Sequence, residues 1–107
     1  MKRDDVVAAL REILKKVAPK AQVILYGSEA RGESRENSDI DVLVLLDKND
    51  ISFEEEERIS APVYDLEIEK GVIISLMVMT KKRWEEASKQ TMFYYNVMKE
   101  GVMLYGN

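Results

Sequence analysis

Asp39 and Asp41, two carboxylates separated by one residue, are the side chains of this sequence best suited to chemistry. Successive side chains of a strand point to opposite faces, so the two carboxylates share a face if the segment is extended. Side by side they repel each other unless a cation lies between them or water surrounds them. At the start of a strand they suit Mg²⁺ or Mn²⁺, hard ions that oxygen ligands hold. Taken alone, the pair is better explained as a solvated strand start.

A second group of residues precedes the pair and favours a binding site over a solvated strand start. Gly27 carries no side chain, so its backbone can approach a phosphate closely, and Ser28 offers a hydroxyl at a possible helix start. Arg31 adds a positive charge whose role is open between phosphate contact and loop structure. Gly-Ser, the ten residues 29–38 and then Asp-x-Asp together predict a site for a nucleoside triphosphate and a metal ion. Such a site is typical of phosphoryl-type transfer.

Composition excludes several other classes of function. We expect the 107 residues to form one domain, residues 1–107. The sequence has no histidine or cysteine, so imidazole-based triads, the usual zinc sites and disulfides are excluded. The net charge of −4 argues against direct nucleic-acid binding. No apolar run is long enough to span a membrane and no signal peptide is evident, so we expect a cytoplasmic protein.

Hydrophobic periodicity predicts the elements that position these residues. A helix over 4–17, ended by Pro19, precedes apolar strands over 22–26 and 39–46, with one helical turn at 28–31 and a polar loop at 32–38 between them. A helix from Phe53 to Gly71 is expected to end, kink or restart near Pro62. A third strand over 72–79, a helix capped by Thr80 that breaks near Gln90, and an extended tail over 102–105 complete the chain.

This order predicts a small α/β sheet with helices packed mainly against one face. In the last helix the aromatic and methionine side chains fall at core spacing, so packing is favoured there. A partner-facing patch formed by Tyr94, Tyr95 and Met98 is the alternative.

Residues 27–32 (Gly-Ser-Glu-Ala-Arg-Gly) and 38–41 (Ser-Asp-Ile-Asp), followed by an apolar run, resemble the minimal nucleotidyltransferases of the DNA polymerase beta-like superfamily. The closing residues 99–105 are also similar, so the resemblance covers nearly the whole chain. It implies an α+β fold with a small mixed sheet and Mg²⁺-dependent transfer of a nucleoside monophosphate, as from ATP. It also implies an antitoxin role toward an all-helical, RNA-cutting toxin of the HEPN type, on which some family members adenylylate a tyrosine.

By the same resemblance, Gly27 and Ser28 hold triphosphate oxygens, while Asp39 and Asp41 are catalytic metal ligands. Active members of the superfamily usually carry a third carboxylate on the later strand, as metal ligand and base for the attacking hydroxyl. Here Ser75 is the expected occupant of that position, and serine is not a base at neutral pH. Loss of the base costs a rate factor on the order of 10² to 10⁴.

Three acids, Asp65, Glu67 and Glu69, precede the third strand and compensate only if the fold brings one of them to the pair. Three hypotheses therefore remain. The first is a nucleotidyltransferase that modifies a hydroxyl of a partner protein, and the second is a catalytically weak or inactive antitoxin that acts by contact. The third, aminoglycoside-type transfer to a small molecule, is least favoured because those enzymes normally carry an extra helical domain.

Overall fold

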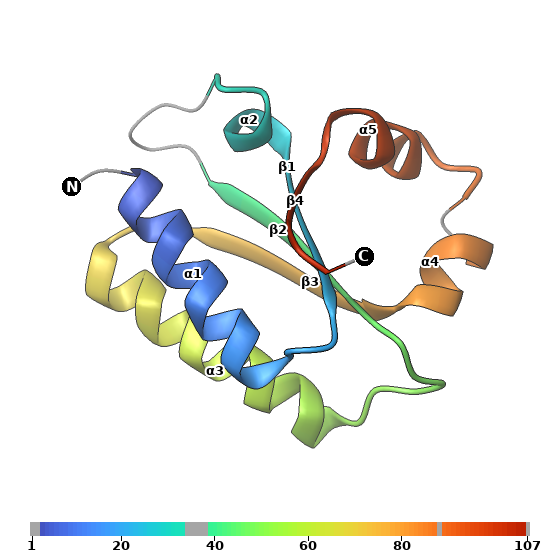
Figure 1. The fold of residues 1–107 in the computed structure, drawn as a ribbon, viewed down its shortest axis with the longest axis horizontal. Coiled ribbons are helices and arrows are strands. Elements are labelled where there is room, and N and C mark those ends of the chain that lie inside the picture. Colours follow the sequence, from blue (N-terminus) through green and yellow to red (C-terminus); the bar gives the residue numbers. More distant parts are fainter. Residues whose placement is uncertain (1–2, 34–38, 88, 107) are drawn as a thin grey trace.

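The computed structural model describes residues 3–33, 39–87 and 89–106 (Figure 1). The chain forms α1 (Arg3–Val17), β1 (Gln22–Tyr26), α2 (Gly27–Ala30), β2 (Ile40–Leu46), α3 (Phe53–Lys70), β3 (Ile74–Thr80), α4 (Lys81–Ala87), α5 (Met92–Glu100) and β4 (Val102–Tyr105). The predicted elements are all present to within a few residues. The polar loop expected at 32–38 lies mostly outside the described residues.

One four-stranded sheet has the order β3-β2-β1-β4. β1 pairs antiparallel with β2 and β4, whereas β2 and β3 are parallel, with α3 as the crossover between them. The sheet is therefore mixed, which confirms the predicted fold class. The extended tail becomes the edge strand β4 and lies beside the first strand of the chain.

The two long helices, α1 and α3, lie side by side on one face of the sheet (Figure 1). The shorter helices α4 and α5 cover part of the other face, where Trp84 and Val97 pack on Ile24 and Leu43. Helices therefore lie mainly on one face, as expected. The larger core, between the sheet and the long helices, includes Leu10, Leu14, Val23, Val42, Val44, Ile59 and Val63.

The expected interruption at Pro62 is wrong, because α3 is one continuous helix. Proline removes one backbone hydrogen bond and crowds the preceding turn. Buried side chains on both sides of it, Ile59, Val63 and Leu66, pack in the same core and hold the two halves together. Tertiary packing thus outweighs the local cost of proline.

The predicted break between the last two helices is confirmed, and each helix has its own cap. Thr80 Oγ1 accepts the Arg83 N–H at 3.1 Å, and Thr91 caps α5 by accepting the Tyr94 N–H. Tyr94 packs on Trp84 with ring centroids 4.8 Å apart. Tyr95 and Met98 are 56% and 53% exposed, so the packing prediction is wrong for these two. They lie on the solvent-exposed side of α5.

The C-terminal strand is fastened to the first helix by Tyr105. Its hydroxyl lies 2.8 Å from the Leu14 carbonyl and 2.7 Å from the Ala18 carbonyl, at the end of α1, and can donate to either. Burial raises the pKa of Tyr105 to about 12. No described helix is long and apolar enough to cross a membrane, and a cytoplasmic location stays a prediction.

Candidate functional site

A row of three side chains crosses the sheet where β1 ends and β2 and β3 begin. Tyr26 pairs with Asp41, and Asp41 pairs with Ser75. Asp39 directly precedes β2, and its Oδ2 accepts a hydrogen bond from Ser75 Oγ at 3.4 Å. The structure therefore brings both predicted carboxylates to one place, with Ser75 beside them.

Gly27 lies against this carboxylate pair. It begins α2 with φ of +74°, a left-handed conformation that residues with a Cβ rarely adopt. A Cβ there would collide with Asp41 Oδ2. The backbone conformation therefore favours glycine, and a Cβ would also have to displace the Asp41 carboxylate. Ser28 follows in the same short turn, and its carbonyl accepts the Glu33 N–H at 2.9 Å, which ties the turn to the chain after it.

The electrostatics of the pair favour a cation. The pKa of Asp41 is raised, first by burial and then by the negative charge of Asp39, while Arg31 acts in the opposite direction. The ionised pair is thus held at a cost that a divalent metal ion between the carboxylates would remove. Asp39 and Asp41 are oxygen donors of the kind that Mg²⁺ and Mn²⁺ prefer. On this observation, the residues present fit such an ion.

Arg31 is engaged by two carboxylates. Its Nε lies 2.6 Å from Glu33 Oε1, and its Nη1 lies 3.3 Å from Glu100 Oε2 at the end of α5. These hydrogen bonds raise the pKa of Arg31. The guanidinium thus ties the turn after α2 to a helix that lies 69 residues further along the chain. These contacts fit the structural side of the role left open for Arg31.

A cavity of about 320 Å³ opens beside Gly27 and Arg31, and the residues that α5 adds to its lining were not predicted from the sequence. It lies between the end of β1 and α5, and Tyr26 and Phe93 meet edge to face in its wall, with ring centroids 5.3 Å apart. Its lining from α5 consists of Phe93, Asn96, Val97 and Glu100. Only the way α5 docks on the sheet brings these residues to the site.

The structure supplies no third acid to the pair among the residues it describes. Ser75, the residue expected at the position of the third acid, pairs with Asp41 across β2 and β3. All three alternative acids lie on α3, and Glu67 Oε2 accepts the N–H of Ile74 at 2.9 Å, so that carboxylate already has a structural partner. No group of three or more acids that could hold a metal occurs within the described ranges.

Comparison with known proteins identifies the family. The model of the nucleotidyltransferase domain matches residues 7–102, so this chain belongs to that family, as its resemblance to the minimal nucleotidyltransferases indicated. A protein of Methanocaldococcus jannaschii, named as a candidate protein adenylyltransferase, is 32% identical over 84 residues, which cover 78% of this chain and 77% of the relative.

Two solved structures share the fold. A toxin–antitoxin complex with AMP-PNP contains a chain with a TM-score of 0.64 and 21% identity, covering 99% of this chain and 75% of its own. An MntA–HpeT toxin–antitoxin complex, a double Asp-to-Glu mutant, contains another with a TM-score of 0.62 and 18% identity, covering 100% and 75%. At these identities the likeness shows a common fold.

Proposed function

We propose that this protein transfers AMP from ATP to a hydroxyl group of a partner protein, with Mg²⁺ or Mn²⁺ as cofactor. The observation that carries the proposal is the carboxylate pair, Asp39 and Asp41, against the glycine of the Gly27-Ser28 turn in a nucleotidyltransferase domain. The relative named as a candidate protein adenylyltransferase supports a protein as the acceptor.

In this reaction the acceptor oxygen forms a bond to the α-phosphorus of ATP, and the bond between that phosphorus and the bridging oxygen of pyrophosphate breaks. Asp39 and Asp41 would hold the metal ion, which would supply charge neutralisation at the phosphates. Gly27 and Ser28 position the triphosphate, and Ser75 orients the Asp39 carboxylate through its hydrogen bond. The proton of the acceptor leaves to water, because no described side chain is placed as a base.

A second candidate function is neutralisation of a toxin by contact, with little or no catalysis. It is favoured by the serine at the position of the third acid and by the engagement of Glu67 with β3. For either function we propose a helical toxin of the HEPN type as partner. The fold shared with chains from toxin–antitoxin complexes supports this choice.

Incubation with ATP, Mg²⁺ and the protein encoded by the adjacent gene, followed by intact-mass spectrometry of that neighbour, tests the proposal. We expect a mass gain of one or more AMP groups that is lost with EDTA and in Asp39→Asn and Asp41→Asn. Asp47→Asn is the matched control, because this exposed aspartate follows the opposite end of β2. A stable complex without any mass gain would reject catalysis and support neutralisation by contact.

A further inference from the structure

β3 is an edge strand with backbone groups that no described strand pairs. The Ile40 N–H donates to the Ile73 carbonyl at 2.9 Å, so the backbone of Ile73 points toward β2. The direction alternates along a strand, so the N–H and C=O groups of Leu76 and Val78 point away from the sheet. At the start of this edge the Ile74 N–H is occupied by Glu67. The unpaired stretch therefore begins after Ile74.

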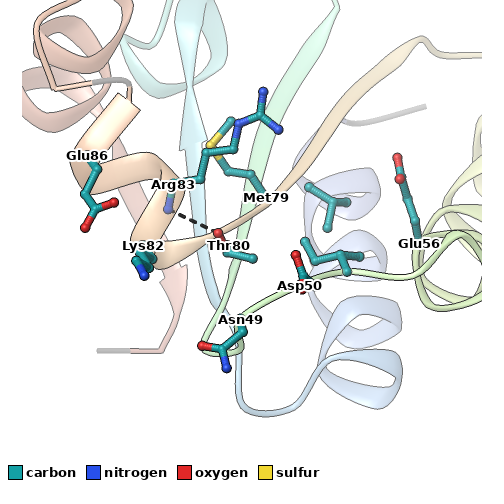
Figure 2. Close-up of a pocket in the computed structure, with 10 residues that line it drawn as sticks. Asn49, Asp50, Glu56, Met79, Thr80, Lys82, Arg83 and Glu86 are labelled. Atoms are coloured by element: carbon teal, nitrogen blue, oxygen red, sulfur yellow. Dashed lines mark hydrogen bonds between the residues drawn. The ribbon is translucent and has the colours of Figure 1, made fainter.

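The α3 side of this edge is hollow. A cavity of about 410 Å³ lies between α3 and β3, and Leu76, Tyr64 and the acidic residues Glu57 and Asp65 line it. We call this cavity the edge groove. The hollow continues along β3 beyond the edge groove. Val78, the next residue whose backbone groups point away from the sheet, lines a second cavity of about 510 Å³. Figure 2 shows this second cavity with Thr80 from β3, Glu56 from α3 and part of α4 in its wall.

The opposite side of the same edge belongs to the candidate catalytic site. Ser75 lies on this side and contacts Asp39. Its neighbours two positions away, Ile73 and Met77, are 59% and 39% exposed. One strand edge thus joins an acidic groove on one face to an apolar strip beside the carboxylate pair on the other.

We propose that the outer edge of β3 binds an extended segment of the acceptor protein, outside the acceptor's helices, as an additional strand. This inference rests on the proposed function and specifies how its substrate docks. Unpaired N–H and C=O groups of an edge strand are satisfied by an added strand, and alternate side-chain pockets give specificity. Adjacent strands lie about 4.8 Å apart, so a side chain placed opposite Ser75 can reach the Asp39 carboxylate.

The alternation of side chains along a strand specifies the sequence of this segment. The acceptor hydroxyl faces Ser75, and the residues two positions away are apolar and meet Ile73 and Met77. The residues directly before and after the acceptor enter the edge groove, where Glu57 and Asp65 favour positive charge. A second copy of this chain is a poorer occupant, because two-fold pairing of β3 with itself would bring two acidic grooves together.

Two peptides of equal composition test the docking without any need for catalysis. Acetyl-Val-Arg-Tyr-Arg-Val-amide has the specified alternation, and acetyl-Arg-Val-Tyr-Val-Arg-amide inverts it. Each is titrated into the ¹⁵N-labelled protein, followed by NMR. We expect the first peptide to slow amide hydrogen exchange at Leu76 and Val78 and to bind about threefold to tenfold more tightly than the second.

Charge reversal at the edge groove provides a second test of the docking. Glu57→Lys combined with Asp65→Lys is expected to abolish the preference for the first peptide, because both residues are exposed on α3 and the fold does not need them. Glu54→Lys combined with Glu69→Lys makes the same change of charge on α3 outside the edge groove, and should keep the preference.

Unchanged amide exchange at Leu76 and Val78 with both peptides would overturn the proposal. A dimer in which these amides are already protected would also overturn it, because a second copy would then cover the edge. If AMP is transferred to a partner while the amides of Leu76 and Val78 stay unprotected, the docking is overturned and the proposed function stands. Protection without AMP transfer supports the docking and counts against catalysis.

Discussion

Substitution of Gly27 by alanine tests the packing of the turn against the carboxylate pair, Asp39 and Asp41. Alanine in the left-handed conformation costs about 1–2 kcal/mol, and a steric clash of the kind that overpacking creates typically costs about 1–3 kcal/mol. The new Cβ would meet Asp41 Oδ2, so both costs apply at this position. We therefore expect Gly27→Ala to lower the free energy of unfolding by about 2–5 kcal/mol. Urea denaturation followed by circular dichroism measures it.

Gly32→Ala is the matched control for backbone strain. Gly32 has φ of +70°, close to that of Gly27, but no described atom lies within 4 Å of a Cβ there. This variant should lose only about 1–2 kcal/mol. The difference between the two variants, about 1–3 kcal/mol, is then the contact with the Asp41 carboxylate.

A double-mutant cycle assigns that difference to Asp41. Asp41→Ala removes the carboxylate, so adding Gly27→Ala to it should cost little more than Gly32→Ala does. The reasoning is refuted if the two glycine variants lose equal stability, or if Gly27→Ala costs the same with and without the Asp41 carboxylate. In either case Gly27 would be a simple turn glycine and would not be fitted to the carboxylate pair.

Three further predictions concern single side chains. Tyr105→Phe should lower the free energy of unfolding by about 1–2 kcal/mol in urea denaturation, because the end of α1 loses its hydroxyl partner. The raised pKa of Asp41 means that its ionisation opposes folding, so without metal Asp41→Asn should stabilise the protein at pH 7 in thermal unfolding. That gain should shrink as the pH falls through the raised pKa of the folded state, and it should disappear below about 3.9, the pKa of an unfolded aspartate, because both states are protonated there. At pH 7, saturating Mg²⁺ should remove it. If Arg31 only supports the loop, Arg31→Gln and Glu100→Gln should change the KM for ATP equally in the transfer assay. A rise confined to Arg31→Gln would indicate a phosphate contact.

The sequence predicted the helices and strands well where a short run of neighbouring residues determines them. The strands are runs of apolar residues, and the helix break near Gln90 follows from the cap at Thr91, whose hydroxyl accepts a backbone N–H. The prediction failed at Pro62. Proline usually breaks a helix, but here α3 stays continuous because buried side chains before and after Pro62 pack in the same core. The prediction failed also at Tyr95 and Met98, because an apolar residue at helical spacing is buried only if a neighbouring element covers it.

The sequence by itself determined the core of the candidate site, because a strand places residues two positions apart on one face and a glycine turn precedes them. Only the structure shows that this glycine lies against the Asp41 carboxylate. The tertiary structure decided what surrounds that core. Ser75 meets Asp39 through the parallel register of two strands joined by a whole helix, and Glu67 is drawn to the start of β3. The ion pair between Arg31 and Glu100 depends on where α5 docks. These contacts join residues far apart in the chain, and packing of the whole domain selects them.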